Sequence, residues 1–177
     1  MNLFWKNGYS NTSIQQLGEQ MNMRPGSLYA AFKSKRELFL QALDLYFEKS
    51  SSTLRQRLKS EGSALEGIHQ YFAALVEVVL DDSAIKGCLM INTATELAAQ
   101  DEEVRQRLQA MFDSHQQQFY QVLLKAQQNG ELSEDKNPES LAAFLLMGIR
   151  GIRLYSQTGI SREALQALVN NLLSILK

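Results

Sequence analysis

Residues 12–39 constrain the fold most, because they hold two short helical patterns joined by only a few residues. Apolar residues recur at i, i+3 and i+7 from Ile14, which is the spacing of one helix face. Leu28 and Phe32, four residues apart in the second pattern, can then pack back onto the first helix. Asn22 lies between the patterns and tolerates the left-handed conformation of a tight turn. Together these residues predict a helix-turn-helix.

The ends of this hairpin carry groups that can bind phosphate. Thr12 or Ser13 can cap the first helix, and Pro25 suits the first turn of the second. A hydroxyl at a helix N-terminus, the Tyr29 hydroxyl and the Lys35 ammonium can each donate to a phosphate oxygen. Such contacts set the register of a protein on a duplex without reading its sequence. The alternative is that Tyr29 belongs to the core and Lys35 is only solvated.

The outward face of the second helix combines one cation with small residues, so the helix is slim enough for a major groove. An Arg can pair with guanine, a Ser can donate or accept, and an Ala methyl can touch thymine. The candidate DNA-binding residues are Thr12, Ser13, Arg24, Pro25, Gly26, Ser27, Tyr29, Ala30, Ala31 and Lys35.

This stretch resembles the TetR family of bacterial helix-turn-helix repressors. The residues that carry the resemblance are Gly8, Tyr9, Thr12, Ser13, Ile14, Gly26, Ser27, Leu28, Tyr29, Phe32, Lys35, Leu38 and Phe39. It implies a DNA-binding domain over residues 1–46, with a truncated first helix, and an effector-binding and dimerisation domain over residues 47–177. It also implies a repressor that binds a palindromic operator as a homodimer and is released by a small-molecule effector. Arg24 departs from the family, which often has a capping Ser there, so we expect a less rigid helix start.

The charge distribution agrees with a single DNA-binding end. The formal net charge is −1, but residues 1–59 hold 9 Lys and Arg against 4 Asp and Glu, whereas residues 60–177 hold 9 against 15. A basic end on an acidic body suits phosphate contact, although chance clustering is the alternative.

Composition indicates a soluble, cytoplasmic protein. The single cysteine excludes an internal disulfide framework and fits a reducing compartment. No apolar run approaches the roughly 18 residues of a membrane span, and no signal peptide opens the chain.

Helical periodicity continues along the whole chain, and no stretch has the pattern of a strand. We therefore predict an all-α fold of about nine helices, the later ones over residues 35–59, 64–80, 84–99, 101–128, 138–158 and 161–176. The helix over residues 84–99 is apolar or small around its circumference, so we expect it to be buried on all sides.

The last two helices favour self-association. Gly148 and Gly151 allow close helix approach, while Arg150 and Arg153 lie among apolar residues and would need carboxylate partners. The resemblance implies a four-helix dimer interface, and a core within one chain is the alternative. The candidate interface residues are Phe144, Gly148, Gly151, Leu154, Tyr155, Leu165, Val169, Leu172 and Leu176.

The middle helices would enclose the effector pocket if the resemblance holds. Mostly apolar and aromatic residues with a few polar ones are typical of small-ligand sites, and they predict an apolar or aromatic effector. The candidates are Phe72, Val76, Met90, Thr93, Glu96, Leu97, Phe112, His115, Phe119 and Met147. Plain core is the alternative for each Met and Phe. Glu96 is the best single candidate, because a buried carboxylate needs a partner: a ligand hydroxyl or cation, His115, or an Arg.

Cys88 supports a second hypothesis about regulation. It follows Lys86 and Gly87 near a helix start, where the helix dipole and an ammonium can lower the pKa of a thiol. Related repressors that sense oxidants or electrophiles use such a thiol. The alternative is a small buried hydrophobic residue.

Catalysis has little support in the sequence. Glu66 and His69 have the spacing of a di-iron ligand pair, but Phe112 replaces the acid that His115 would need. No phosphate loop, nucleophile elbow or zinc spacing occurs, so we predict no enzyme activity, no metal site and no cofactor. The rival to a DNA-binding regulator is an all-α ligand-binding or scaffold protein that never meets DNA.

Overall fold

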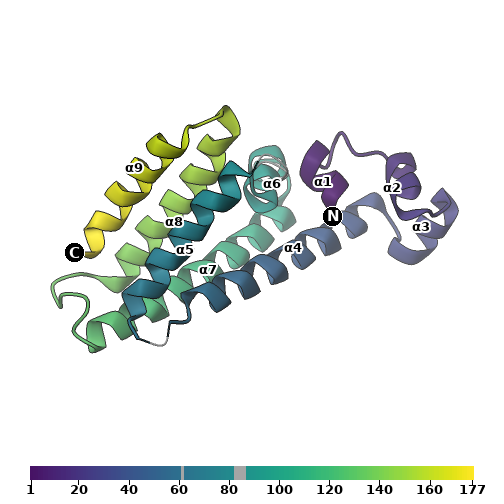
Figure 1. Cartoon of the computed structure of the whole chain (residues 1–177). Coiled ribbons are helices and arrows are strands. Elements are labelled where there is room, and N and C mark those ends of the chain that lie inside the picture. The colour runs from purple at the N-terminus through teal and green to yellow at the C-terminus, as the bar shows by residue number, and fades with distance from the viewer. Residues whose placement is uncertain (61, 82–86) are drawn as a thin grey trace. The chain divides into compact units, whose positions relative to one another are not determined.

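The computed structural model describes residues 1–60, 62–81 and 87–177 (Figure 1). Within these ranges there are nine α-helices and no strands, which confirms the predicted all-α fold. The helices are α1 (Asn2–Asn7), α2 (Ile14–Met21), α3 (Pro25–Phe32), α4 (Lys35–Leu58), α5 (Ala64–Leu80), α6 (Leu89–Leu97), α7 (Glu102–Gln128), α8 (Pro138–Tyr155) and α9 (Arg162–Leu173). None of the helices described is long and apolar enough to cross a bilayer.

Contacts divide the chain into two compact units. The first comprises Met1–Lys49 and Cys88–Leu108, and the second comprises Ser50–Gly87 and Gln109–Lys177. Helices α4 and α7 each contribute one part to each unit. These units follow contacts only, and the functional division near residue 46 stays a prediction.

The hairpin of α2 and α3 forms in the first unit for local reasons. The Ser13 hydroxyl accepts from the Gln16 backbone N–H at 3.1 Å, and the Gln16 side chain accepts from the Ser13 N–H at 2.8 Å. Asn22 ends α2 in the left-handed region at φ 52°, as predicted. A Cβ on Gly18 would lie 2.7 Å from the Met23 carbonyl oxygen, so glycine lets the turn pass close to α2.

An aromatic cluster joins α1 to α4 within the same unit. Helix α1 ends at Gly8, whose φ is 79°. Phe4 is buried, with its ring centroid 5.2 Å from that of Phe39. The Tyr9 ring lies 4.9 Å from the same Phe39 ring. These contacts place the loop after α1 beside the start of α4.

Two arginines connect the start of α4 with the start of α7. The Arg36 guanidinium donates to both oxygens of Asp101, at 3.0 and 2.9 Å, and lies 2.8 Å from the Glu103 carboxylate. Arg107 of α7 pairs with Asp44 of α4 at 2.6 Å. Within the first unit, these ion pairs therefore hold the start of α7 against α4.

Helix α6 differs from its prediction. It starts at Leu89, whereas we expected a start at residue 84, and residues 84–86 lie outside the described residues. Leu89, Met90 and Thr93 are buried, but Thr95 is exposed. The expected burial on all sides is wrong, because the helix packs through one face.

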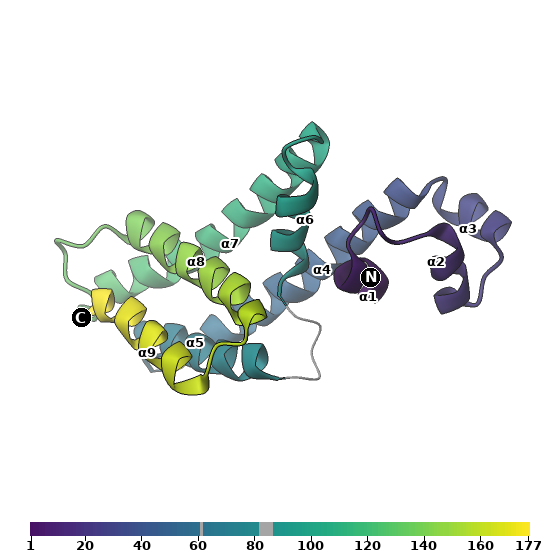
Figure 2. The same cartoon turned by 90° about the horizontal axis from the view of Figure 1, so that it is seen from above.

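The second unit has a single apolar core. The later parts of α4 and α7 surround it with α5, α8 and α9, and α9 lies alongside α8 in both views (Figures 1 and 2). Phe72 and Phe119 are fully buried, and each meets the Tyr71 ring edge-on, with centroid distances of 5.7 and 5.6 Å.

The start of α5 is capped twice. The Ser63 hydroxyl accepts from the Glu66 backbone N–H. The Glu131 carboxylate accepts from the Ser63 hydroxyl at 2.6 Å and from the N–H groups of Ala64 and Leu65 at 3.1 Å each. The Ser63 hydrogen bond, aided by these backbone donors, lowers the pKa of Glu131 to about 2.

Candidate functional site

The outward face of α3 presents the residues predicted to read bases. Leu28 is buried, whereas the Tyr29 side chain is 51% exposed, so Tyr29 does not belong to the core. Arg24 precedes α3 without a side-chain cap, and Pro25 stands in the first turn. The exposed residues of this face are Arg24, Pro25, Gly26, Ser27, Tyr29, Ala30 and Ala31. The face is narrow and free to enter a groove.

The predicted phosphate donors are placed differently from one another. Ser13 is the exposed cap of α2, while Thr12 is buried and its hydroxyl donates to the Gly8 carbonyl at 2.6 Å. The Lys35 ammonium donates to the carbonyl oxygens of Tyr9 and Thr12, both at 2.9 Å, and lies 4.3 Å from the centre of the Tyr9 ring. Two of its three N–H groups are therefore used inside the chain, which leaves one for a phosphate.

Glu96 has a partner that the sequence did not indicate. Its carboxylate accepts from the backbone N–H groups of Tyr9 at 2.9 Å and Ser10 at 2.7 Å. Burial alone would raise the pKa of Glu96, but these hydrogen bonds, with the charge of Lys35, outweigh it and lower the pKa. The partner is therefore neither His115 nor an Arg, the two protein groups that the sequence suggests. No sequence signal marks a backbone N–H as the partner, because every residue except proline has one.

The predicted effector residues fall in both units. Met90, Thr93, Glu96 and Leu97 belong to the first unit. In the second unit, Phe72, Val76 and Phe119 are part of the core, while Phe112 and His115 are partly buried. Met147 is 59% exposed and so lies outside the interior of the second unit. A common pocket for these residues stays a prediction.

Part of this set meets the two arginines of α8. The Arg150 guanidinium lies 4.0 Å from the centre of the Phe112 ring. Burial, and then the charges of Arg150 and Arg153, lowers the pKa of His115 to about 4. The imidazole is therefore neutral near pH 7 and can both donate and accept a hydrogen bond.

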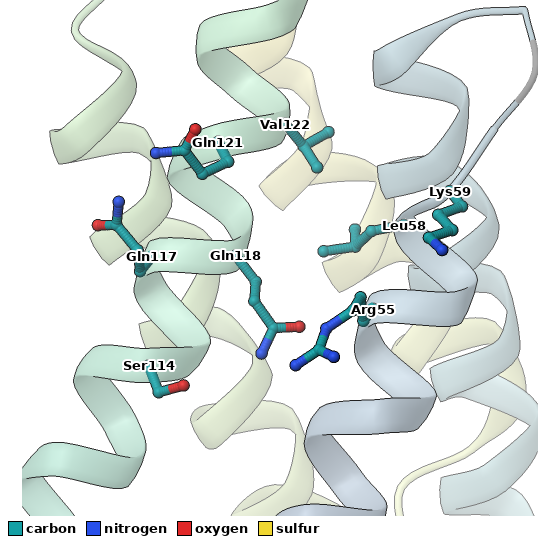
Figure 3. Close-up of a pocket in the computed structure, with 8 residues that line it drawn as sticks. All are labelled: Arg55, Leu58, Lys59, Ser114, Gln117, Gln118, Gln121 and Val122. Carbon is teal, nitrogen blue, oxygen red and sulfur yellow. The ribbon is translucent and has the colours of Figure 1, made fainter.

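A groove of about 410 Å³ lies between α4 and α7 in the second unit (Figure 3). Leu58 and Val122 face the space between the helices, and the Gln118 side chain reaches toward Arg55. The groove is lined by Arg55, Leu58, Lys59, Ser114, Gln117, Gln118, Gln121 and Val122. None of these is a predicted effector residue and none is acidic, so the groove can take an anion with an apolar part.

Cys88 is buried, with 9% of its surface exposed, and stands immediately before α6. Its side chain makes no capping hydrogen bond, and the neighbouring Lys86 lies outside the described residues. In the described ranges, no three His, Cys, Asp or Glu side chains are grouped closely enough to hold a metal ion.

The predicted dimer residues divide into buried and exposed groups. Leu165, Val169 and Leu176 are in the core of the second unit, and Leu172 packs where a Cβ on Gly148 would lie. Phe144 is partly buried. The open side of α8 and α9 instead carries Met147, Gly151, Leu154, Tyr155 and Leu168. That these buried residues also belong to an interface between two chains stays a prediction.

A capped α2, a tight turn and an exposed, slender α3 define a helix-turn-helix DNA-binding protein. Comparison with known proteins identifies the family within this class. The model for bacterial regulatory proteins of the tetR family matches residues 1–42, and the model for the tetracyclin repressor-like C-terminal domain matches residues 64–172.

Individual relatives are similar to this chain over nearly its whole length. The uncharacterized HTH-type transcriptional regulator YezE of Bacillus subtilis (strain 168) is 31% identical over 98% of this chain and 90% of its own length. The HTH-type transcriptional repressor ComR of Escherichia coli (strain K12) is 29% identical, with coverages of 99% and 84%. The TetR family regulator CifR, as a cysteine mutant solved with a 26-bp operator duplex, has a TM-score of 0.88, 32% identity and coverages of 98% and 91%.

The chain belongs to the TetR family of bacterial regulatory proteins. It is a helix-turn-helix transcriptional regulator that binds double-stranded DNA, and members of its family are regulators and not enzymes.

Proposed function

We propose that this chain is a cytoplasmic, ligand-responsive repressor that binds a palindromic operator as a homodimer and leaves it when a small molecule binds. The observation that carries the proposal is the exposed face of α3 beside the capped start of α2. The names of ComR and DhaR, both HTH-type transcriptional repressors, support repression over activation.

The exposed residues divide the work of binding DNA. Ser13, Tyr29 and the remaining Lys35 donor hold phosphates, since each can donate a proton to an anionic oxygen. Arg24, Ser27 and the small residues of α3 contact base edges in the major groove. Thr12 acts indirectly, because its hydroxyl is used within the loop.

Dimerisation uses the open side of α8 and α9. Met147, Leu154, Tyr155 and Leu168 are between 44% and 59% exposed, and a Cβ on Gly151 would meet nothing. Exposed apolar surface of this kind marks a contact between proteins. A C2 pair would place two α3 helices roughly 34–36 Å apart, one turn of DNA.

Release from DNA requires that the effector binds more tightly to the arrangement that cannot bind DNA than to the arrangement that can, typically by about 1–3 kcal/mol. The predicted apolar or aromatic pocket of the middle helices is one location for it. The groove between α4 and α7 is the second, favoured by the Arg55 and Lys59 charges beside Leu58.

Calorimetry with octanoate tests the groove. Arg55→Gln should abolish binding, whereas Arg57→Gln, which removes the same charge from an exposed α4 position outside the groove, should not. Equal octanoate binding by both variants would exclude the groove.

Cys88 is proposed as a regulatory thiol, an idea supported by the cysteine substitutions of the CifR structures. Labelling of the native protein with a mild alkylating agent decides: no modification ends the hypothesis.

An electrophoretic shift assay with the DNA upstream of the protein's own gene tests the proposed function. Retardation at low salt, competed by unlabelled specific duplex, is the expected result. If the chain retards no duplex, the alternative of an all-α ligand-binding or scaffold protein is favoured instead.

A further inference from the structure

Two side chains of opposite charge hold the loop between α1 and α2. Glu96, in the last turn of α6, accepts the N–H groups of Tyr9 and Ser10 at 2.9 and 2.7 Å. Lys35, in the first turn of α4, donates to the carbonyl oxygens of Tyr9 and Thr12 at 2.9 Å each. Both backbone polar groups of Tyr9 are therefore satisfied by charged side chains more than 20 residues away in sequence.

The close fit of the Glu96 carboxylate against this loop favours glycine at position 8. Gly8 has a φ of 79°, and a Cβ placed on it would lie 2.7 Å from Glu96 Oε2. The positive φ therefore disfavours any other residue at position 8, and a Cβ there would displace the Glu96 carboxylate from the loop.

The loop passes directly into the hairpin. The Thr12 hydroxyl donates to the Gly8 carbonyl at 2.6 Å, and the next residue, Ser13, is the cap of α2. Hydrogen bonds to a carboxylate are strong and weaken steeply with poor geometry. The position of α2, and with it α3, therefore depends on where α6 holds the Glu96 carboxylate.

We propose that Glu96 is a positioning residue for DNA binding, which fixes the hairpin on α6 in the arrangement that engages DNA. This proposal depends on the proposed function, since it concerns the same DNA-binding hairpin. A hairpin that samples other positions binds more weakly, by the fraction of time that it spends in the competent one. A CifR cysteine mutant solved with a 26-bp operator duplex matches 98% of this chain at a TM-score of 0.88, so the fold on which the proposal rests occurs in a DNA complex.

Glu96→Gln tests the proposal, because the amide keeps the size of the side chain but offers one acceptor oxygen instead of two. Glu102→Gln is the matched control, since Glu102 belongs to the same unit and pairs with Arg105 of its own helix. Anisotropy measures affinity for the upstream duplex over a salt series, and hydrogen exchange measures the protection of the Tyr9 and Ser10 amides.

For Glu96→Gln we expect roughly tenfold weaker DNA binding, faster exchange at both amides and an unchanged salt slope, because no phosphate contact is lost. Glu102→Gln should bind within about twofold of the parent chain. Glu96→Asp keeps the charge, but its side chain is one methylene too short to reach both N–H groups, so it should also weaken DNA binding. This variant replaces Glu96→Gln in the test if the glutamine variant does not fold.

Parental affinity and parental exchange in Glu96→Gln, or tighter binding by either Glu96 variant, would overturn the positioning role. If the unaltered chain binds no duplex, the proposed function itself fails.

Discussion

At the scale of residues, the exposed face of α3 separates contacts that read bases from contacts that hold phosphates. Arg24 supplies a cation on this face, close in sequence to the small residues Gly26 and Ser27. Tyr29 presents a hydroxyl from the same helix and is 51% exposed. The two classes of contact respond differently to sequence and to salt, so they can be distinguished by substitution.

Arg24→Ala should relax base preference at one or two operator positions, because an arginine that pairs with guanine contributes about 1–3 kcal/mol of discrimination. Selection from a randomised duplex library measures this preference. An unchanged selected sequence would show that Arg24 reads no base.

Tyr29→Phe should weaken binding to all duplexes by a similar factor, since the lost hydroxyl donates to phosphate and carries no sequence information. Anisotropy with specific and random duplexes checks this. A loss confined to the specific duplex would assign Tyr29 to base reading. Lys35 is less suited to this test, because its ammonium also holds the Tyr9–Thr12 loop.

At the scale of elements, helix ends could be predicted where the signal is local. Ser13 caps α2, Asn22 ends it in the left-handed conformation, and Pro25 stands in the first turn of α3. A capping hydroxyl and its N–H partner are within three residues, so the sequence contains both halves of the interaction.

Long-range partners could not be predicted in the same way. Glu96 accepts from N–H groups 86 and 87 positions away, and helical periodicity carries no information about such distances. The partner of the apolar face of α9 could not be predicted either. Helical periodicity shows that a face is apolar, but not whether it packs against its own chain or against a second copy. In the structure, Leu165 and Val169 pack within their own unit.

Glu131→Gln should destabilise the second unit by roughly 1 kcal/mol at neutral pH, the typical value of a helix cap. The pKa of Glu131 is lowered from 4.5 to about 2 in the folded chain. Its contribution to stability is therefore complete above about pH 4.5 and is lost as the pH falls toward 2.

Thermal unfolding from pH 7 to pH 2 measures this contribution. The variant should lose less stability than the parent across the acid range, and Glu134→Gln, an exposed residue of the same connection, should follow the parent. Identical pH profiles for Glu131→Gln and the parent would contradict the cap.

At the scale of the whole molecule, DNA reading and self-association are coupled, because one hairpin contacts too few base pairs to be selective. Leu154→Glu places a charge on the open side of α8, where Leu154 is 52% exposed. It should weaken the dimer at least about tenfold and reduce operator affinity with it.

Sedimentation over a concentration series measures the association of this variant. Leu45→Glu, at an apolar position in the first unit that is 43% exposed, should leave the dimer intact. A Leu154→Glu chain that still dimerises as the parent does would move the interface elsewhere.

Hydroxyl-radical footprinting on the upstream duplex at low salt tests most directly whether paired α3 helices read DNA. We expect two protected segments related by a palindrome and centred about 10 base pairs apart, the spacing of one helical turn. A single protected segment, or none, would contradict the account.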